Sequence, residues 1–324
     1  MTNSDDSISH IRPVQLRSDL VAVADLIELC FAPYLDAEGR DYIRHIRNAP
    51  HDYGGYMLEN STPESSFLPF HGYVWVEDGR IVGNLTLILI RRYLKQAYFV
   101  ANVAVHPDFR GRGIARKLTD RAIEHVRLHK GNAIYLQVRE ENTVAQSLYL
   151  SHGFEETTRR TQWVFRSGHE LLNSSDGTIK VASRKKADWA QQKDWLSALY
   201  PAELAWNFPV QIELLEPSLF NSLNNFLNGI MQRSWSAYEN QRLIGVATFV
   251  RRGEPLDHIW LGTSPAWEER AIAALLPEVQ RQVLAPHKLT LNYPNGRAEG
   301  AFQAAGMVKL NTLIWMKRTM ESAL

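Results

Sequence analysis

The sequence predicts an α/β (α+β) fold arranged as two tandem domains of similar design. The N-terminal half alternates strand-like apolar runs with amphipathic helical segments. Residues 167–178 are rich in Ser, Gly, Asn and Asp, which indicates a linker. The motifs that precede this linker recur after it in the same order, and 324 residues are enough for two domains.

The first elements are predicted from apolar spacing. Residues 11–16 indicate a strand, and Asp19 can cap a helix that carries apolar side chains up to Leu29. Residues 38–48 have the spacing of a second helix. The next residues, 51–71, are aromatic and contain Gly and Pro breakers, which are typical of a loop.

A β-hairpin is predicted next, because the Asp-Gly pair at 78–79 is a strong turn signal between residues 73–76 and 81–91. The apolar run in the second arm is broken by Asn84 and Thr86, so it is too short to span a membrane. The remaining elements of this half are a strand at 97–105, a helix from Ile114 to about His129, a strand at 133–138, a helix at 143–152 and final strands at 154–165.

A basic, glycine-rich loop joins the strand that ends at Val105 to the following helix. Gly111 and Gly113 lack a Cβ, so the main chain can bend and approach a ligand closely. Arginines add positive charge on both sides of these glycines, and the helix N-terminus adds backbone N–H groups. The loop therefore predicts a cradle for a phosphate or pyrophosphate, although basic glycine-rich turns also occur as solvated connections.

A second motif follows the strand at 133–138 and has the form Asn142-x-x-Ala145-x-x-Leu148-Tyr149-x-x-x-Gly153-Phe154. The loop itself, Arg110-Gly-Arg-Gly113-Ile-Ala115, matches the pattern Gln/Arg-x-x-Gly-x-Gly/Ala in full. Through these two motifs, residues 11–166 resemble the acetyl-CoA core of the GNAT N-acetyltransferase superfamily. The resemblance implies that each domain is a mixed, mostly antiparallel, twisted sheet flanked by helices. It also implies acetyl-CoA as co-substrate.

The resemblance implies roles for individual residues. Main-chain groups of residues 102–105 hydrogen-bond the pantetheine arm, and the amides of residues 111–116 bind the pyrophosphate. Asn142 contacts the cofactor or caps its helix, and the two roles are compatible. Tyr149 is predicted to protonate the departing CoA thiolate as general acid, with a packed core aromatic as the alternative. The predicted cofactor-binding residues are Val103, Ala104, Val105, Arg110, Gly111, Arg112, Gly113, Ile114, Ala115, Arg116 and Asn142.

The general base is where the sequence departs from a common family pattern. Phe99 stands where many relatives carry Glu, and a phenyl ring cannot accept a proton. A water relay or an acceptor-side residue would then act as base. The acceptor-side candidates are Glu28, Asp36, Glu38 and His71, whose positions are also typical of surface or capping residues. A further set of aromatic residues either lines an amphipathic acceptor pocket or forms ordinary core: Tyr34, Tyr42, Tyr53, Tyr56, Phe67 and Phe70.

The second half repeats the motifs of the first in degenerate form. Residues 235–249 mirror the hairpin, and residues 264–276 mirror the glycine-rich loop with its helix. Residues 295–307 mirror the motif that begins at Asn142. The alternative is that this repeat is a coincidence and that residues 179–318 form some other α/β domain.

The differences between the two copies predict their roles. Glu268, Glu269 and Ala271 stand where the first copy has Arg110, Gly111 and Gly113, and Phe302 stands where it has Tyr149. Two carboxylates would repel a pyrophosphate, and the glycine bend is lost. Residues 11–166 are therefore predicted to be catalytic, and the domain at 179–318 is predicted to keep the fold without binding acetyl-CoA.

Composition excludes several function classes. The net charge of +1 provides no broad field for nucleic acid or an anionic membrane. Cys30 is the only cysteine, so no intrachain disulfide or Cys-based metal cage can form, and no metal is predicted. Residues 1–10 are predicted to be disordered and lack the apolar segment of a signal peptide, which favours a cytoplasmic protein. Residues 319–324 are predicted to be a short tail.

The predicted function is an N-acetyltransferase that moves an acetyl group from acetyl-CoA to a primary amine by direct attack in a ternary complex. A small-molecule amine is the expected acceptor, by analogy with tandem arrangements in the mycothiol synthase family. A peptide or protein N-terminal or lysine acetyltransferase is the alternative within this class. A non-catalytic acyl-CoA-binding regulatory protein is the alternative from another class.

Overall fold

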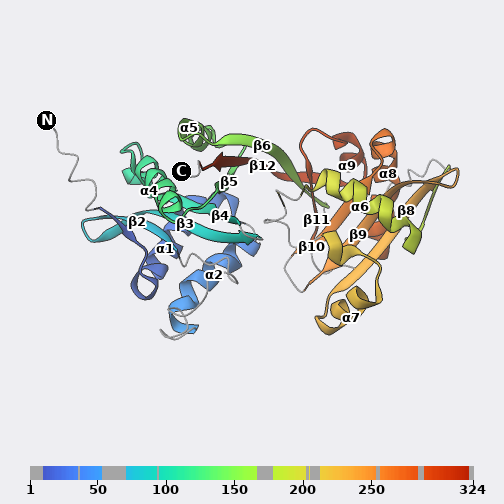
Figure 1. Cartoon of the computed structure of the whole chain (residues 1–324), viewed down its shortest axis with the longest axis horizontal. Helices are drawn as coiled ribbons and strands as arrows, with labels where there is room; N and C mark the ends of the chain where they lie inside the picture. Colours follow the sequence, from blue (N-terminus) through green and yellow to red (C-terminus); the bar gives the residue numbers. More distant parts are fainter. Residues whose placement is uncertain are drawn as a thin grey trace. The chain divides into compact units, whose positions relative to one another are not determined.

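The computed structural model describes residues 10–35, 37–52, 71–92, 95–165, 178–201, 204, 212–252, 256–283 and 288–320. The chain divides into two compact units, residues 1–158 with 314–324, and residues 159–313 (Figure 1). Each unit combines helices with a mixed sheet, as the sequence predicted. The predicted disordered N-terminus and linker lie almost entirely outside the described residues, whereas the predicted tail begins inside a strand that ends at Thr319.

The first unit contains a mixed sheet in the strand order β1-β2-β3-β4-β5-β12. From β1 to β4, each strand pairs antiparallel with the next one along the chain, whereas β4 and β5 pair in parallel. The strand bounds are β1 Ile11–Pro13, β2 Gly72–Glu77, β3 Arg80–Arg92, β4 Lys95–Val105, β5 Ala133–Arg139 and β12 Met307–Thr319. The helices are α1 Leu16–Phe31, α2 Ala37–Asp52, α4 Ile114–Leu128 and α5 Thr143–Ser151, with short 3-10 turns at Ala32–Tyr34 and Pro107–Phe109.

Helices cover both faces of this sheet. On one face, α4 buries the predicted stripe of Ile114, Leu118, Ala122 and Val126 against the core that holds Val100. On the other face, α1 and α2 form a separate core with β2, built from Leu20, Val23, Ala24, Ile27, Ile43, Ile46, Ala49 and Val74. Strand β2 contributes to both cores, because neighbouring residues of a strand point to opposite faces of the sheet.

The second unit has the strand order β6-β11-β10-β9-β8-β7, and its β10 and β11 pair in parallel as β4 and β5 do. The strand bounds are β6 Glu155–Phe165, β7 Ile179–Ser183, β8 Met231–Glu239, β9 Arg242–Arg251, β10 Leu256–Thr263 and β11 Lys288–Pro294. The helices are α6 Trp189–Leu199, α7 Leu219–Leu227, α8 Glu268–Gln282 and α9 Glu299–Ala304, with 3-10 turns at Lys186–Asp188, Ile212–Leu215 and Pro265–Trp267.

The repeat is visible in backbone detail. The β2–β3 hairpin has left-handed residues at Asp78 and Gly79, and the β8–β9 hairpin has them at Asn240 and Gln241. Both hairpins shift register at equivalent places, between Trp75 and Val76 and between Ala237 and Tyr238. The helix that follows also approaches the sheet in the same way, because a Cβ at Gly83 would meet Ile114, and one at Gly245 would meet Ala271, each at 2.8 Å.

Two strands depart from the predicted domain ranges of 11–166 and 179–318. Strand β6 begins in the first unit and ends in the second, where residues 160–164 pair antiparallel with β11. Strand β12 begins in the second unit, and from Ile314 onward it belongs to the first. Apolar patterning predicts a strand at each place, but the choice of partner depends on packing far along the chain.

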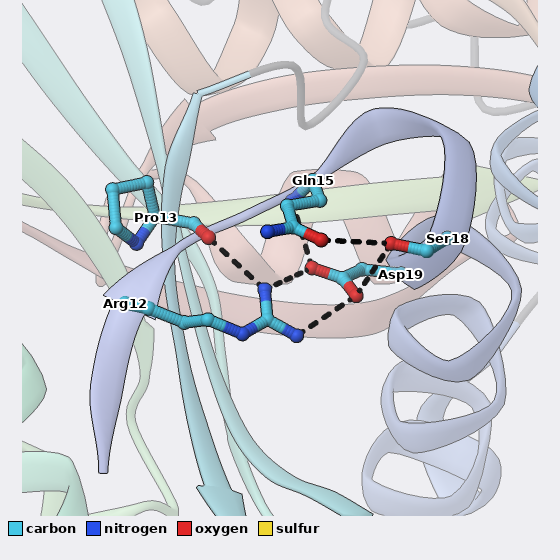
Figure 2. Close-up of polar contacts among 5 residues, drawn as sticks. All are labelled: Arg12, Pro13, Gln15, Ser18 and Asp19. Carbon is cyan, nitrogen blue, oxygen red and sulfur yellow. Dashed lines mark hydrogen bonds and ion pairs between the residues drawn. The ribbon is translucent and has the colours of Figure 1, made fainter. Parts of the chain in front are cut away.

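The prediction that Asp19 caps the first helix is wrong. Helix α1 begins three residues earlier, and its cap residue, Gln15, has no side-chain capping bond. The Asp19 carboxylate is almost fully buried and accepts from the main-chain N of Gln15 at 2.7 Å (Figure 2). Arg12 donates to both carboxylate oxygens, at 2.5 and 3.0 Å. Asp19 therefore ties β1 to the first turn of α1.

Replacing Asp19 by asparagine is expected to lower the free energy of unfolding at pH 7 by about 1–3 kcal/mol, the usual worth of hydrogen bonds to a charged group. Burial raises the pKa of Asp19, but the hydrogen bonds from Arg12 and Gln15 outweigh it, so the net pKa is lowered. The stabilisation is therefore complete at pH values above the pKa that Asp19 has in the unfolded chain. It is lost as the pH falls through the lower pKa that Asp19 has in the folded chain.

Urea unfolding at a series of pH values tests this expectation. Asp25→Asn is the matched control, because Asp25 lies on the same helix and makes an exposed ion pair with Arg47. The difference between Asp19→Asn and the unaltered chain should shrink as the pH is lowered below about 4. Equal stability of the two variants at pH 7 would show that the Asp19 contacts do not stabilise the fold.

Candidate active site

The parallel strands β4 and β5 separate before either strand ends. Their pairing runs from Ala97 with Ala133 to Val100 with Leu136. Strand β4 continues to Val105 and β5 to Arg139. The edge of β4 that faces β5 therefore offers backbone N–H and C=O groups to an extended ligand beyond this point. The predicted cofactor residues Val103, Ala104 and Val105 lie on this edge.

A β-bulge lies in the same part of β4. Against β3, Asn84 pairs with Ala104 but Thr86 pairs with Ala101, so Asn102 and Val103 together oppose one residue. Asn102 adopts a left-handed backbone with φ of 51°, a conformation that asparagine tolerates better than most residues. A bulge of this kind redirects main-chain groups, and here it redirects those that the resemblance assigns to the pantetheine arm.

A buried polar cluster holds this bulge. The amide of Asn84 donates to the main-chain carbonyl of Asn102 at 2.9 Å, and the amide of Asn102 donates to the hydroxyl of Tyr42 at 2.7 Å. The Thr86 hydroxyl lies 3.4 Å from both amides. Burial raises the pKa of Tyr42 to about 12, so its hydroxyl stays neutral. Sequence reasoning missed this cluster, although Asn84 and Thr86 were visible as polar interruptions of an apolar strand.

The glycine-rich loop lies at the end of β4. Gly111 and Gly113 have φ of 78° and 77°, and an added Cβ would meet no atom within 4 Å at either position. The requirement for glycine here is therefore the left-handed backbone and not space. Arg110 donates to the Val105 carbonyl at 3.2 Å, and the Arg112 guanidinium lies 4.6 Å from the Phe109 ring centre.

Helix α4 begins directly after this loop. Its cap residue, Gly113, has no side chain, and its carbonyl accepts from the Lys117 N–H at 3.0 Å. The N–H groups of Ile114, Ala115 and Arg116 precede the first intrahelical donor, so the helix itself supplies no acceptor for them. Such N–H groups, with the positive end of the helix dipole, suit an anion.

Tyr149 lies on α5, which follows β5 after a three-residue turn. Its side chain is 6% exposed and packs edge-to-face on Phe154, with ring centres 5.7 Å apart. Burial raises the pKa of Tyr149, so the phenol is protonated at neutral pH. Among the described residues, no group hydrogen-bonds its hydroxyl. The side chain is thus a core aromatic whose hydroxyl remains available as a proton donor.

Asn142 is the cap residue of α5, because its side-chain oxygen accepts from the main-chain N of Ala145 at 3.1 Å. This confirms the capping role. The residue is exposed, so its amide NH₂ remains free to donate, and the cofactor contact stays a prediction.

The candidate bases are placed as follows. Glu28 is exposed and forms an ion pair with Arg47 at 2.6 Å, which is a surface role. His71 precedes β2, and burial lowers its pKa. Asp36 and the side chain of Glu38 lie outside the described residues. Of the aromatic set, Tyr34 is exposed and Tyr42 joins the bulge cluster, whereas Tyr53, Tyr56, Phe67 and Phe70 lie outside the described residues.

The corresponding part of the second unit is built differently. Strand β10 has no bulge, since its pairing with β9 runs unbroken from His258 to Thr263. Helix α8 begins at Glu268, whose carboxylate accepts from the Tyr293 hydroxyl and from Arg297, each at 2.6 Å. An internal ion pair therefore lies at the helix start that corresponds to the glycine-rich loop.

Two kinds of feature are absent from the described ranges. No helix there is long and apolar enough to cross a membrane. In the same ranges, no group of three or more His, Cys, Asp or Glu side chains is placed to hold a metal ion.

Comparison with known proteins places these features in a family. Residues 31–154 match the model of the acetyltransferase (GNAT) family. A curated relative, the [ribosomal protein bS18]-alanine N-acetyltransferase of Salmonella typhimurium, is 40% identical over 70 residues, which are 21% of this chain and 47% of that protein. N-alpha-acetyltransferase RimI of Mycobacterium tuberculosis is 33% identical over 101 residues, 31% of this chain and 62% of that protein. The chain thus spans about half to three fifths of these relatives.

Solved structures match over the length of the chain. A GCN5-related N-acetyltransferase from Sphaerobacter thermophilus aligns with a TM-score of 0.58 at 18% identity and covers 95% of both chains. A tandem GNAT protein from the clavulanic acid biosynthesis pathway aligns with a TM-score of 0.54 at 16% identity, over 95% of this chain and 98% of that one. These structures show the fold of the chain, and the family match shows an acetyltransferase (GNAT) family domain in residues 31–154.

Proposed function

We propose that the first unit is an N-acetyltransferase that transfers the acetyl group of acetyl-CoA to a primary amine. The observation that carries the proposal is the bulged, open edge of β4 that ends in the glycine-rich loop. A pantetheine arm has amide groups that can pair with this edge as a strand would. The N–H groups from Gly111 to Arg116 suit the diphosphate at the other end of the same path.

The chain's own groups supply most of the chemistry. A main-chain N–H at the bulge stabilises charge on the thioester oxygen as the amine nitrogen attacks the carbonyl carbon. The carbon–sulfur bond breaks as the carbon–nitrogen bond forms, and Tyr149 donates its proton to the thiolate. The amine proton leaves through water, because Phe99 offers no acceptor at the position where many relatives carry Glu.

Two observations favour different acceptors. The tandem fold resembles a tandem GNAT protein from the clavulanic acid biosynthesis pathway, and this analogy to a biosynthetic protein favours a small-molecule amine. One curated relative named above is a [ribosomal protein bS18]-alanine N-acetyltransferase and the other is an N-alpha-acetyltransferase, which favours a protein N-terminus as the second candidate. Steady-state kinetics with small amines and with a peptide that begins with alanine separates the two through kcat/KM.

Calorimetric titration of the intact chain with acetyl-CoA, followed by a thiol-release assay over an amine panel, tests the proposal. One binding site per chain and amine-dependent release of CoA are expected. Two sites would overturn the proposal that the second unit, with Glu268 at its helix start, does not bind the cofactor. Binding without turnover of any amine or peptide would favour an acyl-CoA-binding regulatory protein, and no binding would reject the proposal.

The polar cluster at the bulge gives a separate prediction. Asn84→Leu preserves side-chain size but leaves the Asn102 carbonyl without its buried donor, which costs about 1–3 kcal/mol. We expect the KM for acetyl-CoA to rise about 5- to 50-fold, because part of this free energy is lost from holding the bulge in the conformation that binds the cofactor. Thr86→Val is the control, because its hydroxyl contacts are long. An unchanged KM in Asn84→Leu would show that the cluster does not support cofactor binding.

A further inference from the structure

We infer that the acceptor of the first unit is an amine that also carries an anionic group, and that Arg139 and Lys317 hold this group. The inference rests on the proposed function, since it names the substrate class of the same site. It is carried by three side chains on one face of β5 and β12: an amide and two cations that have no hydrogen-bond acceptor or carboxylate partner in the described part of the chain.

The first observation concerns Gln137 on β5. Its side-chain nitrogen is buried and has no hydrogen-bond partner among the residues that the structure describes. A buried donor without an acceptor costs about 1–3 kcal/mol, so such groups in folded proteins usually have a role. Gln137 directly follows Leu136, the last residue of β5 that pairs with β4. The orphaned donor therefore lies where the two strands begin to separate.

The second observation is the face on which Gln137 lies. Ile134, Leu136 and Val138 are buried in the core beneath α4. Alternation places Tyr135, Gln137 and Arg139 on the opposite face. Because the core fills the first face, an amine can reach the opening between β4 and β5 only from the face of Gln137.

Strand β12 is the neighbour of β5 and contributes to this face. Ile314 and Met316 belong to the core beneath α4, so Lys317 lies on the other side. Its ammonium nitrogen is 5.9 Å from the centre of the Tyr135 ring. The Arg139 guanidinium is 4.5 Å from the centre of the Tyr34 ring.

The third observation is the lack of carboxylate partners. Among the described residues, neither Arg139 nor Lys317 forms an ion pair, although both are only partly exposed. Both cations instead lie over aromatic rings, which hold a cation in place and leave its N–H donors free. Other arginines of this unit, such as Arg47 and Arg121, are paired with carboxylates. Two fixed cations beside an orphaned amide form a receptor for an anion.

The spacing sets the geometry of the acceptor. Gln137 and Arg139 are two residues apart, so their Cα atoms are separated by about 7 Å along the strand. An amine at the opening would therefore have its carboxylate or phosphate several bonds away. Aminocarboxylates and aminoalkyl phosphates share this chemistry.

Paired acceptors test the inference. The ω-amino acids from glycine to 5-aminovalerate are compared with their methyl esters, and aminoalkyl phosphates with the corresponding aminoalcohols. We expect kcat/KM to be at least about tenfold higher for the anionic member of the best pair, which corresponds to one charge-assisted contact. Arg139→Gln should reduce this ratio, and Arg139→Gln combined with Lys317→Gln should bring it to near 1, while the KM for acetyl-CoA stays unchanged.

Arg127→Gln is the matched control, because it removes the same charge from an exposed position at the end of α4. Each pair is also titrated calorimetrically in the presence of CoA, so that preference is measured without turnover. Equal affinity and equal kcat/KM for both members would overturn the inference while the acetyltransferase proposal stands. A preference that survives Arg139→Gln and Lys317→Gln together would also overturn it. Failure to bind acetyl-CoA at all would instead reject the proposed function.

Discussion

Replacing Tyr149 by phenylalanine is expected to lower kcat by about 10²- to 10⁴-fold, the usual contribution of a positioned general acid. The affinity for acetyl-CoA should change less than about twofold, because the ring packing on Phe154 is kept and only the hydroxyl is removed. The departing thiolate would then take its proton from water. A thiol-release assay measures kcat, and calorimetry measures the affinity for acetyl-CoA separately.

The raised pKa of Tyr149 also predicts how kcat responds to pH. Burial disfavours the phenolate, so the acid remains protonated through neutral and moderately alkaline pH. No alkaline loss of kcat from this group is expected below the ordinary tyrosine pKa of about 10. Tyr73→Phe is the control, since Tyr73 belongs to the same core and its hydroxyl instead contacts His125 at 2.9 Å. A Tyr149→Phe variant with full kcat would identify Tyr149 as a packed core aromatic without a chemical role.

The elements that the sequence predicted are those whose causes are local. Helix α4 could be predicted because four buried residues recur at helical spacing, and the β2–β3 hairpin because Asp78 and Gly79 favour its turn. The glycine-rich loop could be predicted because a left-handed backbone at Gly113 requires a residue type that is visible in the sequence.

The features that could not be predicted depend on contacts between distant residues. The bulge at Asn102 is defined by its register against β3 and is held by side chains up to 60 residues away. Asn84 alone indicates only that a strand is interrupted by a polar residue. A carboxylate near a helix start predicts a cap, whereas the partner of Asp19 is Arg12, which lies on a strand. Local sequence determines whether a segment forms a helix or a strand, and tertiary packing determines which residues it contacts.

Replacing Gly113 by aspartate is expected to weaken acetyl-CoA binding by about 30-fold or more. A non-glycine residue at φ of 77° adds about 1–3 kcal/mol of backbone strain to the bound geometry. A carboxylate within a few ångströms of a diphosphate adds about 1–4 kcal/mol of repulsion. Calorimetry of the variant measures the sum, and thermal unfolding checks that the fold is kept.

Gly229→Asp is the matched control for this change. Gly229 also has a left-handed backbone, with φ of 64°, and an added Cβ there would meet no atom within 4 Å. It lies in the second unit at the end of α7, so it should leave cofactor binding unchanged while imposing a similar local strain. Tight binding by Gly113→Asp would place the diphosphate elsewhere and would remove the main support for a cofactor site at the start of α4.

The second unit has a negative charge of its own near the corresponding helix start, at the position that aligns with Arg110. Glu268 stands at the start of α8 and is already neutralised by Arg297 and hydrogen-bonded by Tyr293. If a negative charge at the helix start is what prevents binding, Gly113→Asp should abolish the single site of the chain and reveal no second one. If instead the second unit fails to bind acetyl-CoA because β10 lacks the bulge, Glu268→Gln should not create a second cofactor site. A second site in Glu268→Gln would show that charge alone separates the two units, because β10 has an unbroken register in either case.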